Sequence, residues 1–194
     1  MSLVDLPSDL LYDISSRINY SSKQALLVSC KKLYHKLKLL PSFHKTNLKR
    51  YNMADLLEIE QWPCYNSAQY MPEEQRQPID QRDYFACYLC LKIRTAGIFS
   101  NAMMKGKRGK ISPTHSAERN RRFCIDCGVK NGTYRAGTRM GFGGVQLGGV
   151  YGVGGGYGVV CSICGQFREI PAFESIAQTK CIECSSALIE RRSR

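Results

Sequence analysis

The chain has 194 residues and a formal net charge of +12 at pH 7, and this length suits one domain or two small ones. Leu, Ile, Val and Phe supply only 23% of the residues, close to the level of about 20% at which highly charged chains tend to be disordered. This composition excludes a large hydrophobic core and indicates that another interaction contributes to stability.

The first forty residues predict three short helices. Proline suits the first position of a helix and an acidic residue suits its positive end, so Leu6-Pro7-Ser8-Asp9 predicts a helix start. Apolar residues then recur on one face, at Leu10, Leu11, Ile14 and Ile18. Three such helices cannot enclose a core of their own, because chains of about 40 residues usually need a staple or a partner. Their remaining apolar surface therefore predicts docking.

The starts of the second and third helices are predicted from serines. The segment Ser21-Ser22-Lys23-Gln24 fits a capping box and precedes a short apolar helix over residues 25–28. We expect Ser29 to cap the third helix, and Pro41 to end it. The apolar residues of this helix, Leu33, Leu37 and Leu40, point one way, and its lysines take the remaining faces.

Residues 3–14 (Leu-Val-Asp-Leu-Pro-Ser-Asp-Leu-Leu-Tyr-Asp-Ile) and 26–34 (Leu-Leu-Val-Ser-Cys-Lys-Lys-Leu-Tyr) resemble the opening and closing segments of the F-box. The resemblance covers residues 3 to about 40 and departs from many F-boxes at Ser21, where they have an acidic residue. It implies docking onto the Skp-family adaptor of an SCF (Skp, cullin, F-box) ubiquitin ligase. The contact positions carried over are Leu6, Pro7, Leu10, Leu11, Ile14, Leu26, Leu27, Val28 and Leu33. The alternative is that these residues pack against the C-terminal half of the same chain.

Residues 42–85 form a predicted connection. A short helix is expected between Asn52 and Gln61, where Pro63 ends it. The polar stretch 72–78 is bounded by prolines and predicts a linker or an exposed loop.

Four cysteine pairs with the same two-residue gap dominate the C-terminal half. A CxxC turn lets two thiolates reach one tetrahedral zinc ion at about 2.3 Å, and four pairs within about a hundred residues are a strong signal. We therefore expect two structural zinc ions, held by Cys87, Cys90, Cys124, Cys127, Cys161, Cys164, Cys181 and Cys184. Disulfides are the weaker alternative, because no basic region followed by an apolar run suggests secretion. A redox pair would need a strand-helix-strand context that is not evident around any pair.

The spacing alone does not determine which two cysteine pairs share each zinc ion. Shorter loops cost less entropy to close, which favours sequential pairing, the first pair with the second and the third with the fourth. A crossed arrangement is the alternative. The sixteen residues between Cys164 and Cys181 give the last two pairs the spacing of a zinc ribbon. Gly128 and Gly165 follow second ligands, where glycine tolerates the positive φ of a knuckle turn.

A basic cluster lies between the first two pairs. It comprises residues 105–110 (Lys-Gly-Lys-Arg-Gly-Lys), with Arg119, Arg121 and Arg122 farther along, in a half of the chain (residues 86–194) that carries +11 of the net charge. Such residues could contact nucleic-acid phosphates. The favoured interpretation is a solvated loop whose basic groups offset the negative charge of a four-thiolate centre.

The run from residue 141 to 158 contains ten glycines. A membrane helix here is excluded on energy, since ten glycines in a helix cost on the order of 10 kcal/mol relative to alanine. We expect a flexible excursion between two metal knuckles, in the form of an elongated hairpin tip.

The combination of the N-terminal helices with the cysteine pairs resembles a group of fungal F-box proteins with cysteine-rich C-terminal regions, and the glycine-rich run departs from that pattern. The closest correspondence is Lys107-Arg108-Gly109-Lys110 followed by residues 122–128 (Arg-Phe-Cys-Ile-Asp-Cys-Gly). The resemblance implies an adaptor that recruits a target protein to the ligase. The alternative function is a zinc-ribbon nucleic-acid binder that uses the basic loop 105–122.

The sequence thus predicts a small α+β protein. Its predicted parts are a three-helix F-box (1–41), a helical connection (42–85) and a β-rich, loop-rich region with two zinc ions (86–190) that contains the glycine-rich insertion. We expect an intracellular protein of the cytoplasm or nucleus, with no membrane association. No catalytic constellation appears around His35, His44 or His115, so we do not expect an enzyme.

Overall fold

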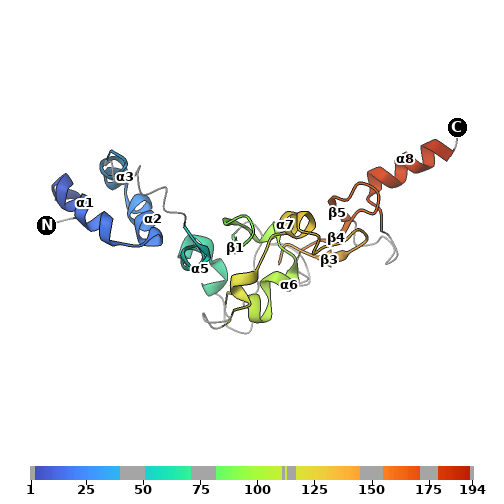
Figure 1. Cartoon of the computed structure of the whole chain (residues 1–194), viewed down its shortest axis with the longest axis horizontal. Helices are drawn as coiled ribbons and strands as arrows, with labels where there is room; N and C mark the ends of the chain where they lie inside the picture. The colour runs from blue at the N-terminus through green and yellow to red at the C-terminus, as the bar shows by residue number, and fades with distance from the viewer. Residues whose placement is uncertain are drawn as a thin grey trace. The chain divides into compact units, whose positions relative to one another are not determined.

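The structure, a computed structural model, describes residues 3–39, 51–70, 82–110, 112, 117–144, 155–170 and 179–192. The chain forms two compact units, Met1–Ile59 and Glu60–Arg194. Figure 1 shows helices at the N-terminus, followed by small sheets and further helices. The expected mixture of helices and strands is present. Pro41, the proline-bounded stretch 72–78, His44 and His115 lie outside the described residues.

The N-terminal unit is helical. Its elements are a 3-10 turn (Leu3–Asp5), α1 (Ser8–Arg17), α2 (Tyr20–Ser29), α3 (Lys31–Lys38) and α5 (Met53–Ile59). Among the described residues, Leu11, Leu33 and Leu37 form a small hydrophobic cluster with partly buried apolar side chains around them, and Leu56 and Ile59 of α5 are also buried. The small size of this core agrees with the expectation that three short helices enclose little apolar surface.

Two of the predicted helix caps are wrong. The cap of α2 is Asn19, whose side-chain oxygen accepts a hydrogen bond from the backbone N–H of Ser22 at 2.8 Å. Ser21 instead lies inside the helix and is buried. The cap of α3 is the Cys30 sulfur, which accepts from the Leu33 N–H at 3.4 Å, while Ser29 ends α2. Asn19 is a strong N-cap residue, so the helix begins earlier than the serine pattern indicated.

The C-terminal unit begins with two 3-10 turns and a hairpin. The turns are Pro63–Tyr65 and Ser67–Tyr70, and the hairpin pairs β1 (Tyr84–Cys87) with β2 (Lys92–Thr95) in antiparallel fashion. After the hairpin come a 3-10 turn (Ala96–Ile98), α6 (Asn101–Met104), two more 3-10 turns (Gly106–Arg108 and Arg119–Arg121) and α7 (Ile125–Lys130). The hydrophobic core of this part consists of Phe85, Cys87, Ala96, Phe99, Met103, Met104, Phe123 and Cys124. Two cysteines of the predicted zinc sites are therefore core residues.

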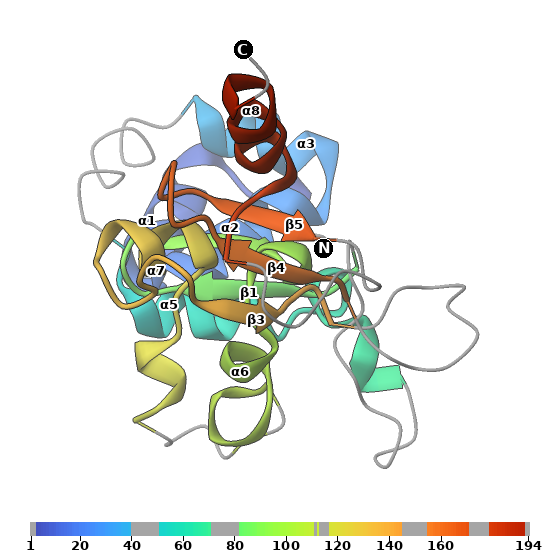
Figure 2. The ribbon, with the colours of Figure 1, turned by 90° about the vertical axis from the view of Figure 1, so that its right-hand side faces the viewer.

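A second sheet and a final helix complete the unit. β3 (Arg139–Gly141), β4 (Tyr157–Val160) and β5 (Phe167–Ile170) form an antiparallel sheet in chain order, as Figure 2 shows. The last described element is α8 (Ile182–Arg192). None of the described helices is long and apolar enough to cross a membrane.

The glycine-rich run joins two paired strands, since Gly141 in β3 is opposite Tyr157 in β4. Its centre, residues 145–154, lies outside the described residues. Two glycines near its end are required by close contacts. A Cβ on Gly155 would meet the carbonyl oxygen of Phe142, and a Cβ on Gly158 would fall 2.1 Å from the Phe167 ring. Phe167 thus fills the space that a side chain at Gly158 would need.

This contact makes a prediction about the second sheet. Gly158→Ala should destabilise β4 and β5 by roughly 1–3 kcal/mol, because the added methyl group displaces the Phe167 ring. Hydrogen exchange of the β4 and β5 amides measures the effect, and Tyr157→Thr, at an exposed position of the same strand, is the control. Equal protection in Gly158→Ala and Tyr157→Thr would contradict the packing argument.

Candidate metal centres

The first cysteine cluster joins a hairpin to a helix. Cys87 is the last residue of β1, and Cys90 lies in the turn between β1 and β2. Cys124 immediately precedes α7, and Cys127 lies in its first turn. The four sulfur atoms all lie within 4.8 Å of one another. Cys87 and Cys124 are fully buried and the other two are half-buried.

The second cluster has the same construction. Cys161 follows β4, Cys164 lies in the turn that leads to β5, and Cys181 and Cys184 lie at the start of α8. These four sulfurs also lie within 4.8 Å of one another. The sulfurs thus meet in sequential pairs, which is the grouping that the shorter loops favour.

Matching hydrogen bonds hold the two clusters together. In the first cluster, the backbone N–H of Tyr88 donates to the Arg122 carbonyl at 2.9 Å. In the second cluster, the N–H of the equivalent Ser162 donates to the Thr179 carbonyl, also at 2.9 Å. In addition, the N–H of Cys124 donates to the Cys87 sulfur at 3.4 Å. The N–H of Cys181 donates to the Cys161 sulfur at 3.3 Å in the same way. The two clusters are therefore two copies of one structural unit, a hairpin knuckle joined to a helix start.

The helix in this unit was not expected. Spacing indicated a zinc ribbon for the last two pairs, but in both clusters the second pair is at a helix N-terminus. Residues three apart on a helix share a face, so a CxxC sequence suits this position as well as it suits a turn. The positive end of the helix dipole also points toward the sulfurs and favours their negative charge.

The residue after the second cysteine of each knuckle has left-handed backbone geometry. Gly165 has a φ of 69° and the equivalent Leu91 has a φ of 50°. The prediction for Gly165 is confirmed, whereas that for Gly128 is wrong, because Gly128 lies in α7. Gly128 is needed for packing instead, since a Cβ there would lie 2.5 Å from the Tyr134 ring and 2.7 Å from the Phe123 ring.

The thiols of each cluster do not ionise equally. A hydrogen bond with the Cys124 thiol lowers the pKa of Cys87 to about 4, and burial raises the pKa of Cys127 to about 11. Burial also opposes ionisation of Cys161, but backbone N–H groups outweigh it and lower its pKa to about 6. Burial raises the pKa of Cys181 to about 12. Ionisation of all four thiols in a cluster therefore requires a nearby cation, which a bound metal ion would provide.

Two arginines place positive charge beside the first cluster. Burial alone would lower the pKa of Arg94, but the thiols of Cys124 and Cys90 near its guanidinium raise it. Burial lowers the pKa of Arg122, against the opposing effects of Glu60 and Cys87. Basic groups thus offset the sulfur charge, as the sequence indicated, although Arg94 lies outside the basic loop to which this role was assigned.

The basic loop is only partly solvated. Arg119 and Arg122 are fully buried, and both guanidinium groups bind the carboxylate of Glu60, which is itself fully buried. The backbone N–H of Ala86 in β1 also donates to this carboxylate at 2.7 Å. These two arginines are therefore unavailable to nucleic-acid phosphates, contrary to the alternative of a phosphate-binding loop 105–122.

Lys110 has a similar buried position. Its ammonium group lies 3.8 Å from the Asp83 carboxylate and 4.8 Å from the centre of the Phe85 ring, and it donates to the Tyr65 carbonyl. Burial lowers the pKa of Lys110 to about 8. Lys105, Lys107 and Arg121 remain exposed. The buried charges bring residues 60–65 together with β1 and with the segment that leads into Cys124.

Sequence reasoning missed Glu60 and Asp83. Glu60 lies inside the helix predicted between Asn52 and Gln61, among acidic neighbours, where a solvated carboxylate is expected. The one available signal was an excess of positive charge in a chain with a small core, because buried cations need buried anions. That signal indicates the need for partners but does not say which acidic residues supply them.

The nine predicted adaptor contacts divide by exposure. Leu11 and Leu33 are buried in the core of the N-terminal unit. Leu6, Ile14, Leu26 and Leu27 are half-buried. Pro7 is exposed, and Leu10 and Val28 expose 48% and 70% of their surface. Leu11 and Leu33 thus hold the helices together, and the exposed positions are the ones free to contact another protein.

Comparisons with known proteins do not add a family to this description. No family model matches the sequence, and neither curated proteins nor solved structures include a significant match. Inferences about function therefore depend on the residues and geometry of this chain.

The buried carboxylate leads to a quantitative prediction. Glu60→Gln should destabilise the C-terminal unit by roughly 3–5 kcal/mol, because it leaves two buried guanidinium groups without their counter-charge. Glu118→Gln is the matched control. It removes the carboxylate that pairs with Arg108 at 3.0 Å, but both side chains are more than a third exposed, so the cost should stay below about 1 kcal/mol.

Urea unfolding followed by Trp62 fluorescence measures both changes, since Trp62 lies in the same unit as Glu60. Equal costs for the two substitutions would show that the Glu60 cluster does not stabilise the fold.

Proposed function

We propose that the two cysteine clusters each bind one structural zinc ion. Each cluster offers four sulfurs and, among the described residues, no oxygen or nitrogen ligand. Thiolate sets of this kind suit zinc. Tetrahedral Zn–S bonds of about 2.3 Å separate the sulfurs by about 3.8 Å, a distance that the clusters accommodate within their 4.8 Å spread.

The ions would stabilise a unit that has little hydrophobic core. A structural zinc site contributes roughly 10–16 kcal/mol of apparent binding free energy, whereas the net stability of a domain is about 5–15 kcal/mol. Four thiolates around each ion also leave no open position for a water molecule, which favours a structural role over a catalytic one.

We further propose that the chain is an adaptor of the F-box type. The observation that carries this proposal is the apolar surface of a helical unit in which the described core of α1 and α3 is a cluster of three leucines. Leu10, Val28 and Leu39 expose 48%, 70% and 82% of their surface. Exposed apolar side chains on these helices would suit a protein partner, and the resemblance of residues 3–40 to the F-box implies that this partner is a Skp-family adaptor. The zinc-stabilised unit would then present a surface to a target protein.

The metal proposal predicts a stoichiometry. Native mass spectrometry of the full chain, purified without added metal, should show two zinc ions per molecule. Substituting Cys124→Ala and Cys127→Ala together should reduce this to one, because only the second cluster keeps four sulfurs. The control is Cys30→Ala with Cys64→Ala, which removes the two cysteines outside the clusters and should keep both ions. A single ion or none in the unaltered chain would contradict the proposal.

The adaptor proposal predicts loss of binding at exposed positions. Leu10→Asp and Val28→Asp should together weaken binding to a purified Skp-family adaptor at least about 100-fold, since each buried aliphatic side chain contributes roughly 1.5–3 kcal/mol. Calorimetry measures the affinity, and circular dichroism verifies that the helices persist. Tyr70→Asp, at a position that is 72% exposed outside these helices, is the control and should bind normally. Absence of binding by the unaltered chain would refute the adaptor function.

A further inference from the structure

The two cysteine clusters are copies of one unit, but solvent reaches them differently. Cys90 and Cys164 are equivalent, since each is the second cysteine of its knuckle. Cys90 is half-buried and packs against the hydrophobic core of its part of the unit. Cys164 is exposed, and it is the only exposed cysteine among the eight cluster residues that the structure describes. The two clusters therefore differ in solvent exposure at one pair of equivalent cysteines, Cys90 and Cys164.

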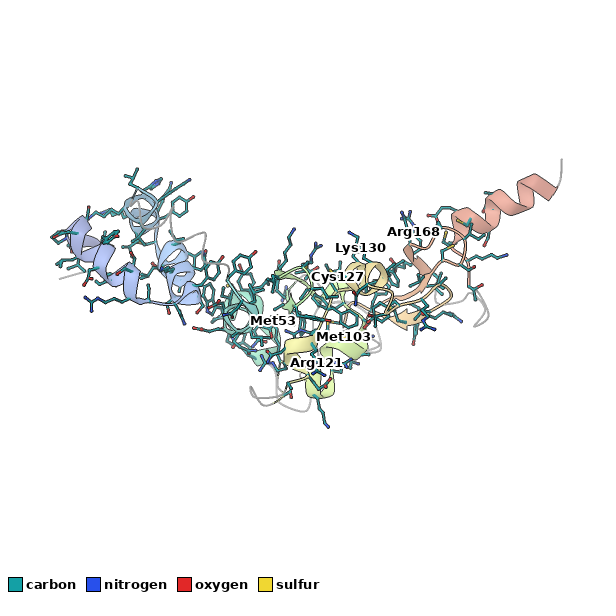
Figure 3. The ribbon with its side chains drawn as sticks, in the orientation of Figure 1. Met53, Met103, Arg121, Cys127, Lys130 and Arg168 are labelled. Carbon is teal, nitrogen blue, oxygen red and sulfur yellow. The ribbon has the colours of Figure 1, made fainter. Side chains whose placement is uncertain are left out.

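The residues around the knuckles explain this difference. Four positions after the second cysteine, both knuckles carry an arginine, Arg94 in β2 and Arg168 in β5. Arg94 is half-buried and lies beside the Cys90 and Cys124 sulfurs. Arg168 is exposed and donates to the Gln166 side chain at 2.9 Å, and Figure 3 shows it pointing outward from β5. Among the described residues, Arg94 thus places a cation beside two sulfurs of the first cluster, whereas the charge of the equivalent Arg168 is near the carboxylate of Glu183.

Hydrogen bonds within the second cluster are also uneven. The Cys161 sulfur accepts N–H groups from Ile163 at 3.4 Å and Cys181 at 3.3 Å. In the part of the chain that the structure describes, no such N–H reaches the Cys164 sulfur. A thiolate that is exposed and accepts few hydrogen bonds keeps more of its nucleophilicity, because exposure and thiolate character determine susceptibility to oxidation.

We propose that Cys164 is a peroxide-reactive thiolate and that its oxidation releases the second zinc ion while the first ion stays bound. This inference rests on the proposed function, in which both clusters hold zinc. It assigns the two copies different roles. The first is a permanent structural site, and the second is a redox-sensitive site.

The oxidation balances with hydrogen peroxide as the oxidant. The Cys164 thiolate attacks one peroxide oxygen, the O–O bond breaks, and the products are a sulfenic acid and hydroxide. The thiolate of Cys184, the half-buried member of the cluster, then attacks the sulfenic sulfur and expels a second hydroxide. Two thiolates lose two electrons to form a Cys164–Cys184 disulfide, and the peroxide is reduced by the same two electrons. Zinc loses two of its four ligands and dissociates.

Release of this ion would free the final helix. α8 begins at Ile182, directly after Cys181, and Cys184 lies in its first turn. The cluster therefore connects α8 to the knuckle between β4 and β5. Loss of the ion removes this connection, so the oxidised chain should differ from the reduced chain mainly from residue 161 onward.

The experiment treats the full zinc-loaded chain with increasing hydrogen peroxide. Zinc release is followed with a colorimetric chelator, and the oxidised cysteines are identified by differential alkylation and peptide mass spectrometry. We expect one equivalent of zinc to be released first, together with a Cys164–Cys184 disulfide, while the cysteines of the first cluster remain reduced. Release of both ions together, or earlier oxidation of Cys87, Cys90, Cys124 or Cys127, would overturn the inference.

Two histidine substitutions provide matched variants. Cys164→His keeps a zinc ligand but removes the reactive sulfur, so the first release should slow at least about tenfold. Cys90→His, at the equivalent position of the first cluster, should leave the first release unchanged. An unchanged rate in Cys164→His would overturn the inference. If that variant does not hold two ions, the peptide map of the unaltered chain decides alone. Fewer than two zinc ions before peroxide is added would instead overturn the metal proposal itself.

Discussion

The C-terminal unit depends on the meeting of four sulfur atoms at each of two points. Four thiols within 4.8 Å of one another cannot all ionise unless a cation lies among them, because like charges at this distance repel strongly in a protein interior. A bound ion removes this repulsion and joins segments that are distant in sequence. The first cluster links the β1–β2 hairpin to α7, and the second links the β4–β5 knuckle to α8. A bound ion would thus attach each helix to its hairpin through sulfur ligands, in addition to the backbone hydrogen bonds.

Several basic residues of the loop 105–122 contribute to the structure of the C-terminal unit, although their place in a loop suggested solvated side chains. Arg119, Arg122 and Lys110 are buried or nearly so, and Glu60 and Asp83 supply only two negative charges. The remaining positive charge is close to the first cluster, where Cys87 affects the ionisation of Arg122. A four-thiolate zinc centre at this cluster would carry two negative charges, so the cations would complement both the carboxylates and the metal site. The buried charges and the first metal centre therefore form one continuous polar interior, packed against Phe85.

The sequence was sufficient for the features that depend on local spacing. The CxxC gap identified all eight clustered cysteines, and leucine periodicity predicted the N-terminal helices. Contacts between residues far apart in the sequence could not be predicted. Glu60 and Arg119 are 59 residues apart, and no local pattern distinguishes a buried carboxylate from a solvated one. The helices α7 and α8 were not predicted at the cysteine clusters, because a CxxC sequence is compatible with a turn and with a helix start. The left-handed backbone of Leu91 could not be predicted either, because leucine does not favour this conformation. The geometry of the knuckle imposes it.

We propose that bound metal, more than apolar packing, holds the C-terminal unit in its folded form. Amide hydrogen exchange of the full chain, measured with zinc and again in excess strong chelator, tests it most directly, because α1–α3 contain no ligand and serve as an internal reference. We expect the amides of β1, β2, β4 and β5 to lose their protection in chelator, while those of α1–α3 keep theirs. Protection of the four strands that persists after complete removal of the metal would contradict it.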